Sequence, residues 1–160
     1  GSLITRPEIL TRALVKGGSE EQKRHWLPKL AVAEVMPAVA VTEPDYGSDV
    51  ANIKVTATPA VGPDGADGYV INGVKTWCTF GARADALALL ARTDPDRSKT
   101  HRGLSLFIVP KPRGDAHGLV FTQDAVAVDG VAEDRGAGLA ILFQAHQASV
   151  QHLRGCAARD

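Results

Sequence analysis

The chain has 160 residues, of which 44% are hydrophobic and 22% are charged, a composition typical of a globular domain. Eighteen basic residues balance eighteen acidic residues, which argues against a nucleic-acid or membrane-surface binder, because such proteins need a basic excess. The longest apolar patch, LAILF at 139–143, is too short to form a membrane span, and the N-terminus lacks the apolar core of a signal peptide. Two cysteines are too few for a disulfide scaffold, so we expect a cytoplasmic protein.

Residues 7–34 are predicted to be helical. Apolar residues recur at helical spacing in EILTRALVKG, and the pair Gly17-Gly18 marks a stop. Ser19 is followed three residues later by Gln22, the pattern of a capping box that opens a second helix. Pro28 is expected to end or kink this helix. The buried stripe of the second helix is predicted to contain Trp26, Leu27 and Leu30.

From about Met36, short runs rich in Val, Ile, Thr and aromatic residues alternate with turn-forming segments. The dipeptide Asn72-Gly73 lies between two such runs and predicts a β-hairpin. Because no helical pattern separates the runs, the sequence predicts a mostly antiparallel, barrel-like sheet and therefore an α+β fold. Past Gly114, LVFTQDAVAVDGVAED is compatible with one or two strands, and GAGLAILFQAHQASVQHLRG is interpreted as a helix.

Two segments contain candidate site residues. In TEPDYGSD, Gly47 permits a turn that a Cβ would hinder, and Ser48 can cap the helical turn DVANI that follows. Exposed amides in such a turn can bind an anionic ligand group, but the segment is also compatible with a plain strand-to-helix connection. In NGVKTWCTFGARAD, Trp77 is placed in a strand, where its indole serves either as a platform for a flat ligand or as a core residue.

Several longer segments follow one another along the chain: SEEQKRHWLPKLAVAEVMPAVAVTEPDYGSDVANI, YVINGVKTW, GARAD, LLARTDP and RGLSLFIV. In their order and spacing they resemble the acyl-CoA dehydrogenases, and the resemblance runs from about residue 13 to about residue 112. The resemblance implies an N-terminal helical domain, an FAD-binding middle β-domain and a C-terminal helical bundle. On this basis, residues 1–34 are assigned to the end of the helical domain, residues 35–122 to the FAD-binding β-domain, and residues 123–160 to a tail that matches no family pattern.

The resemblance also implies a reaction, the FAD-dependent α,β-dehydrogenation of an acyl-CoA thioester. In this family a carboxylate removes the α-proton while a hydride passes to the flavin, and the electrons continue to an electron-transfer flavoprotein. Intact members are homo-oligomers. The glutamate base belongs to the C-terminal bundle, which we expect to be missing, so no catalytic residue is assigned. The chain is therefore predicted to be a fragment of such an enzyme, and an inactive β-domain without flavin is the alternative.

Eight residues match the family's flavin segments, VAVTEPDYGS at 39–48 and WCT at 77–79, and no metal site is predicted. In the first segment, the backbone of Val41 and the hydroxyl of Thr42 would hydrogen-bond the isoalloxazine, and Ser48 would meet the acyl-CoA. Glu43 is not a candidate base, Asp49 is expected to bond amides of its own loop, and Asp45 is expected to face solvent. The predicted cofactor-binding set is Val39, Val41, Thr42, Gly47, Ser48, Trp77, Cys78 and Thr79.

Three positions depart from the family's usual residues. Val39 replaces a common aromatic residue, Cys78 a common isoleucine and Phe80 a common asparagine, which indicates a modified flavin pocket. The segments KTWCTFGARAD and RGLSLFIVPKP are similar to those of enzymes that act on carboxylated or branched acyl-CoAs, such as methylsuccinyl-CoA.

Overall fold

The computed structural model describes residues 2–61, 67–110, 119–122, 140–143, 147–148 and 151–152. The helices are α1 (Ser2–Gly17) and α2 (Glu20–Ala31), with 3₁₀ turns η1 (Val50–Asn52), η2 (Gly81–Arg83) and η3 (Arg97–Gly103). The strands are β1 (Pro37–Ala40), β2 (Thr56–Val61), β3 (Asp67–Lys75), β4 (Ala86–Arg92), β5 (Leu104–Pro110), β6 (Leu119–Thr122), β7 (Ala140–Phe143), β8 (Gln147–Ala148) and β9 (Gln151–His152). In this part of the chain, no helix has the length and hydrophobicity of a membrane span.

The two predicted helices are confirmed. Helix α1 ends at Gly17, and the capping box forms as expected: the Ser19 hydroxyl accepts from the Gln22 amide at 3.2 Å, and the Gln22 side chain accepts from the Ser19 amide at 2.9 Å. Pro28 does not end α2, because the helix continues to Ala31. Pro28 is exposed, so water can replace the hydrogen bond that proline cannot donate. Of the predicted stripe, Trp26 and Leu30 are buried and Leu27 is partly buried.

The strands form one sheet in the order β6-β7-β3-β2-β4-β5-β9, with β1 paired to β4 and β8 paired to β3. All pairings are antiparallel except those that β1 and β2 make with β4. The predicted α+β fold with a mostly antiparallel sheet is therefore confirmed. Over the described residues the order runs from β6 to β9 without closing, so "barrel-like" describes the sheet only loosely.

The predicted hairpin at Asn72-Gly73 is wrong, because β3 runs straight through both residues. Gly73 has a φ of +135°, and a Cβ there would lie 2.6 Å from the Val55 side chain. The glycine is thus needed for a close approach and not for a reversal of the chain. At the same point β3 changes partner, since residues 67–72 pair with β2 and residues 73–75 pair with β7.

The predicted helix in GAGLAILFQAHQASVQHLRG is also wrong where the structure describes this segment. Strand β7 pairs with β3 and β6, β8 pairs with β3, and β9 pairs with β5. A short apolar run does not by itself distinguish a helix from a strand, and the edges of β3 and β5 supply hydrogen-bond partners that local sequence does not reveal. One strand in LVFTQDAVAVDGVAED, β6, agrees with the prediction.

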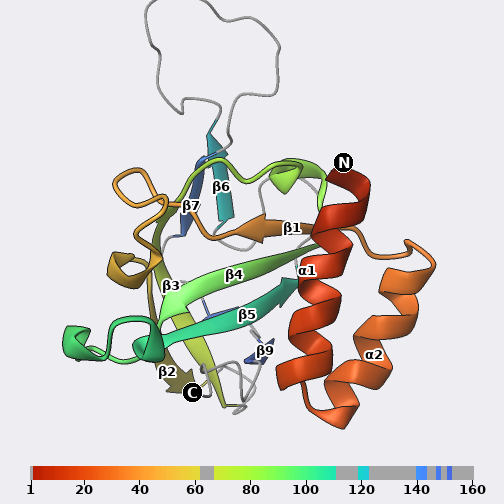
Figure 1. Cartoon of the computed structure of the whole chain (residues 1–160), viewed down its shortest axis with the longest axis horizontal. Coiled ribbons are helices and arrows are strands. Elements are labelled where there is room, and N and C mark those ends of the chain that lie inside the picture. Colours follow the sequence, from red (N-terminus) through yellow and green to blue (C-terminus); the bar gives the residue numbers. More distant parts are fainter. Residues whose placement is uncertain are drawn as a thin grey trace, which may run out of the picture.

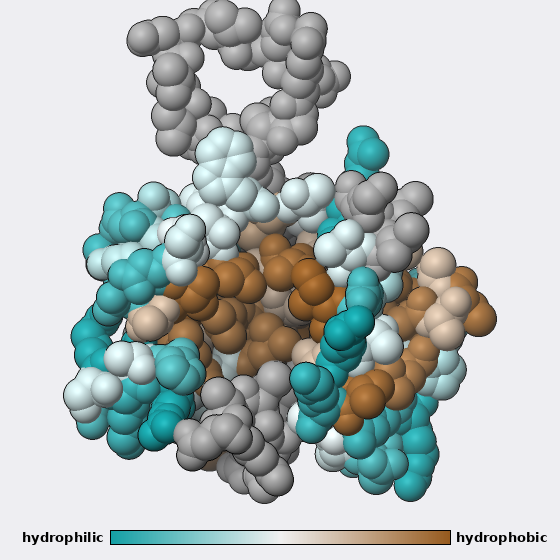
Figure 2. All heavy atoms as spheres, in the orientation of Figure 1, coloured by the Kyte–Doolittle hydropathy of each residue, from teal (hydrophilic) through white to brown (hydrophobic). Residues whose placement is uncertain are grey.

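The sheet is hydrophobic on both faces, and its strands alternate between them. One face carries Leu87, Leu89 and Phe107, which pack in a core cluster with residues of β2 and β3. The other face carries Ala86, Ala88 and Ile108, which pack against α1 and α2. Figure 1 shows α1 next to β1, β4 and β5, with α2 on its outer side. Figure 2 shows hydrophobic residues gathered across the middle of this view, with hydrophilic residues on both flanks.

Strands β1 and β2 both pair with the same edge of β4, and the chain leaves the sheet between them at residues 41–55. Glu43 closes this excursion, because its carboxylate accepts hydrogen bonds from the amides of Lys54 at 2.6 Å and Val55 at 2.9 Å. The ammonium of Lys75, at the end of β3, donates to the same carboxylate at 2.9 Å and to the Val41 carbonyl at 2.8 Å. Both side chains are buried, so this ion pair is a structural one.

We predict that Glu43→Gln lowers the free energy of unfolding by about 3–5 kcal/mol, because the substitution leaves the Lys75 ammonium buried without a counter-charge. Urea unfolding followed by circular dichroism measures this change. Asp45→Asn is the matched control: it removes the partner of Lys54 in an exposed ion pair, and we expect no measurable change. Equal effects of the two substitutions would contradict the structural role of Glu43.

Candidate functional site

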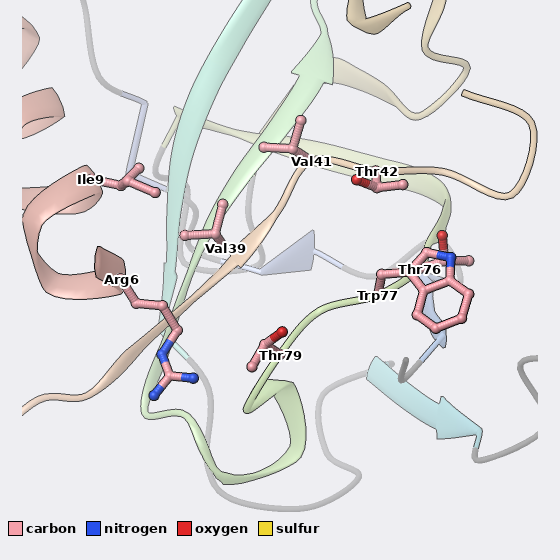
Figure 3. Close-up of a pocket in the computed structure, with 8 residues that line it drawn as sticks. All are labelled: Arg6, Ile9, Val39, Val41, Thr42, Thr76, Trp77 and Thr79. Carbon is pink, nitrogen blue, oxygen red and sulfur yellow. The ribbon is translucent and has the colours of Figure 1, made fainter. Parts of the chain in front are cut away.

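A pocket of about 230 Å³ lies between α1, the end of β1 and the segment that follows β3. Figure 3 shows Arg6 and Ile9 on the α1 side and Trp77 on the opposite side, with β1 and its continuation between them. The residues that line the pocket are Arg6, Ile9, Val39, Val41, Thr42, Thr76, Trp77 and Thr79. The volume is below the roughly 300–1,000 Å³ of a site that encloses a whole drug-sized ligand. It therefore suits part of a ligand, such as a ring system or a short chain.

Strand β1 takes part in both the core and the pocket because its side chains alternate between faces. Ala38 and Ala40 are buried in the core cluster of one face, whereas Val39 packs on the helix side and lines the pocket. Val41 and Thr42 follow directly and line the pocket too. The Thr42 carbonyl accepts a hydrogen bond from the Thr76 amide at 2.8 Å, which fixes the two lining segments against each other.

The segment after β3 forms a tight turn that points alternate side chains in opposite directions. Trp77 has a φ of +57° and is 61% exposed, and it lies beyond the end of β3. Its placement in a strand and its interpretation as a core residue are therefore wrong. The Thr79 amide donates to the Trp77 carbonyl at 2.9 Å, and the Gly81 amide donates to the Cys78 carbonyl at 2.8 Å. Cys78 is buried in the core and anchors the turn, while Trp77 and Thr79 face the pocket.

Two buried polar atoms of the pocket residues have no hydrogen-bond partner among the described residues: the hydroxyl of Thr76 and Nε of Arg6. Both residues are only 7% exposed. The Arg6 guanidinium lies over the Phe80 ring, 4.6 Å from the ring centroid, in a cation–π contact, while Nε has no hydrogen-bond partner. Unpaired buried polar atoms are rare, and a bound ligand group is one physical reason for them.

The structure brings five of the predicted site residues together at the pocket: Val39, Val41, Thr42, Trp77 and Thr79. Gly47 and Ser48 are exposed and do not line it, and the buried Cys78 side chain does not line it either. Two expectations for the turn are wrong. A Cβ on Gly47 would meet nothing within 4 Å, and the 3₁₀ turn η1 begins after Asp49 without a side-chain cap from Ser48.

Sequence reasoning missed three lining residues, Arg6, Ile9 and Thr76. A signal for Arg6 existed: it lies on the buried stripe of α1 with Leu10 and Leu14, where an arginine is out of place. Thr76 precedes the matched tripeptide WCT. Its amide donates a hydrogen bond to the Thr42 carbonyl, a contact that the sequence alone does not indicate.

The acids of TEPDYGSD do not converge on the pocket. Asp45 is exposed, as expected, and its ion pair with Lys54 at 2.8 Å raises the pKa of that lysine. Asp49 accepts from the side chain of Asn52 at 2.7 Å, and not from amides of its own loop as we predicted. Within the described part of the chain, no group of His, Cys, Asp and Glu residues could hold a metal ion.

Burial raises the pKa of the Cys78 thiol to about 12, against an ordinary value of 9.0. We predict that Cys78 in the folded chain reacts roughly 1,000-fold more slowly with iodoacetamide at pH 8 than the unfolded thiol does, because so little thiolate is present. The folded state keeps its proton more tightly, so stability falls as pH rises from about 9 to about 12. Labelling in a Cys156→Ser background, followed by mass spectrometry, measures the rate. Rapid labelling without denaturant would contradict the prediction.

Comparisons with known proteins identify the family. The family model described as "Acyl-CoA dehydrogenase, middle domain" matches residues 38–138. The (2S)-methylsuccinyl-CoA dehydrogenase of Cereibacter sphaeroides is 44% identical over 114 residues, which cover 71% of this chain and 20% of that protein. The crystal structure of acyl-CoA dehydrogenase from Geobacillus kaustophilus superposes with a TM-score of 0.73 at 32% identity, covering 97% of this chain and 40% of that one. An FAD complex of PigA superposes with a TM-score of 0.69 at 28% identity, covering 91% of this chain and 35% of that one.

The chain spans about a fifth of the length of the curated dehydrogenase and two fifths of the Geobacillus chain. The family match takes in most of β1, the strands β2 to β6 and the pocket residues from Val39 to Thr79, and the Geobacillus superposition covers 97% of the chain. These matches confirm the resemblance found in the sequence. The chain therefore belongs to the acyl-CoA dehydrogenase family, and it carries the family's middle domain.

Proposed function

We propose that the pocket is part of the flavin and acyl-CoA site of an enzyme that dehydrogenates an acyl-CoA thioester between Cα and Cβ. The observation that carries the proposal is the pairing of two segments far apart in sequence, 39–42 and 76–79, around one pocket that contains an unpartnered buried hydroxyl. Family membership supports the reaction class, because the relatives are acyl-CoA dehydrogenases.

The residues present fit the ring portion of FAD. The exposed indole of Trp77 offers an apolar face to a flat ring, and the Thr42 and Thr79 hydroxyls offer donors and acceptors beside it. The unpaired Thr76 hydroxyl supplies another polar group. When bound, FAD supplies the oxidising centre that accepts a hydride from the substrate. We assign Trp77, Thr42, Thr76 and Thr79 to holding that ring, with Val39 and Val41 excluding water from its edge.

In this proposal the described part of the chain binds and orients the flavin and the acyl-CoA, but it does not supply the group that accepts the proton. None of the residues that line the pocket is a carboxylate. Glu43 is unsuitable because it already accepts three hydrogen bonds, two of them from backbone amides that hold the excursion closed. A general base must reach the proton that it removes, so we assign proton abstraction to a residue outside this set.

Several further features belong to the same proposal. Residues 1–34 would be the end of the helical domain and residues 35–122 the FAD-binding β-domain, which agrees with the change from helices to strands between α2 and β1. The family model extends to residue 138, beyond the predicted boundary at residue 123. By analogy with the family, the electron acceptor would be an electron-transfer flavoprotein and the enzyme a homo-oligomer. The cytoplasm remains our expected location on cysteine content.

Thr79→Val tests the flavin assignment, because it removes a pocket hydroxyl with almost no change in side-chain volume. We expect the wild-type chain to retain FAD through gel filtration, and Thr79→Val to bind it about tenfold more weakly, the cost of roughly one hydrogen bond. Absorbance at 450 nm in the protein peak reports retention. Thr58→Val is the matched control, since Thr58 is exposed on β2 and does not line the pocket. A folded wild-type chain that elutes colourless would favour the alternative, an inactive β-domain without flavin.

A further inference from the structure

Arg6 is a buried cation that lines the pocket without a counter-charge. It is only 7% exposed, and it takes part in none of the ion pairs found among the described residues. By contrast, Arg12 on the same helix is exposed and pairs with Glu8 at 2.8 Å. A buried charge without a partner is costly, and sites that break such a rule are expected to be functional.

Phe80 holds the charge of Arg6 in place without neutralising it. The guanidinium lies 4.6 Å from the centroid of the Phe80 ring. A cation–π contact offsets part of the cost of burial, but, unlike a carboxylate, it brings no negative charge. The buried Lys75 differs, because its ammonium donates to the Glu43 carboxylate at 2.9 Å. The field of Lys75 is therefore largely cancelled by its partner, whereas Arg6 exerts the field of a whole positive charge.

This field acts across the pocket. Among the described residues that line the pocket, Arg6 is the only one that carries a charge. Figure 3 shows its side chain extending from α1 toward the side of the pocket where Thr79 lies. A charge acts more strongly in apolar surroundings than in water, and Ile9, Val39 and Val41 are apolar. A ring held in this pocket would therefore lie in the field of one positive charge.

The charge of a flavin ring changes when it is reduced. The oxidised ring is uncharged, and a hydride carries one proton and two electrons, so the ring that accepts a hydride from the substrate gains one negative charge. A positive charge fixed beside the ring stabilises the reduced state more than the oxidised state, and this raises the reduction potential of the cofactor. The guanidinium itself stays protonated throughout, so no proton passes to or from Arg6.

We propose that Arg6 is a fixed positive charge that raises the reduction potential of the bound flavin and thereby favours its acceptance of the hydride. This inference rests on the proposed flavin site, because it concerns the electronic properties of the ring held there. The role differs from that of Trp77 and the threonines of the pocket, which hold the ring in either oxidation state. Arg6 should therefore contribute little to the affinity for oxidised FAD and more to the affinity for reduced FAD.

Anaerobic reduction of the FAD-loaded chain beside a reference dye measures the potential. We expect Arg6→Gln to retain oxidised FAD as the wild type does, because the oxidised ring has no charge that Arg6 could pair with. Its affinity for reduced FAD should fall on the order of tenfold, which for a two-electron couple lowers the potential by about 30 mV. Arg6→Lys keeps the charge and should restore most of the wild-type potential. Arg12→Gln, which removes an exposed arginine of the same helix, should leave the potential unchanged.

Arg6→Met is a second uncharged variant, which keeps the length of the side chain and suits the apolar stripe of α1 if Arg6→Gln does not fold; the same shift is expected. An unchanged potential in the uncharged variants, or an equal fall in Arg6→Lys, would overturn the role of Arg6 as a charge while leaving the flavin site in place. Loss of oxidised FAD from both folded uncharged variants would also overturn it, because Arg6 would then hold the cofactor in both states. Failure of the wild type to retain FAD would overturn the inference and the proposed function together.

Discussion

The pocket depends on one buried ion pair, between Lys75 and Glu43. Two charges without contact to solvent are stable only when their hydrogen-bonding capacity is met, and here the carboxylate accepts from two backbone amides as well as from the lysine. Burial lowers the pKa of Lys75, while the hydrogen bond and charge of Glu43 act in the opposite direction. Because Lys75 also donates to the Val41 carbonyl, the pair ties the end of β3 to the start of the excursion after β1. Both segments that line the pocket begin within a residue or two of these bonds.

Strand alternation explains how so short a strand as β1 serves two purposes. Every second residue enters the core beneath β2 and β3, and the residues between them turn toward the helices. The same rule holds in β4 and β5, so α1 packs on a continuous apolar surface that includes Ala88 and Ile108. The wall of the pocket formed by Arg6 and Ile9 therefore keeps its position as long as α1 stays packed on the sheet. The residues that hold α1 on the sheet therefore also determine the shape of the pocket.

Local rules predicted the elements whose cause is local, and the failures share a non-local cause. The capping box at Ser19 and the stop at Gly17 depend on neighbours within one helical turn, and both appear as expected. Gly73 was predicted to turn the chain because Asn-Gly pairs usually form turns. Glycine is needed there instead because Val55, eighteen positions earlier, packs against it too closely for a Cβ. The two segments that we propose hold the flavin were recognised because the residues of each are adjacent in sequence. The position of Arg6 on the apolar stripe of α1 was a local signal, but the sequence does not show that this stripe faces the segments 39–42 and 76–79 across a pocket.

The buried polar atoms without partners differ in what surrounds them, and this difference supports a ligand at the pocket. Arg92 also has unpaired nitrogens, yet its remaining nitrogen donates to the Ala51 carbonyl, and its side chain packs closely under Gly103. Arg92 therefore links η1 to β4, and its role is structural. Arg6 Nε and the Thr76 hydroxyl make no such link, and both residues line the pocket. Each unmet hydrogen bond costs about 1–3 kcal/mol, so a ligand group that met one of them would bind and stabilise the fold through the same contact.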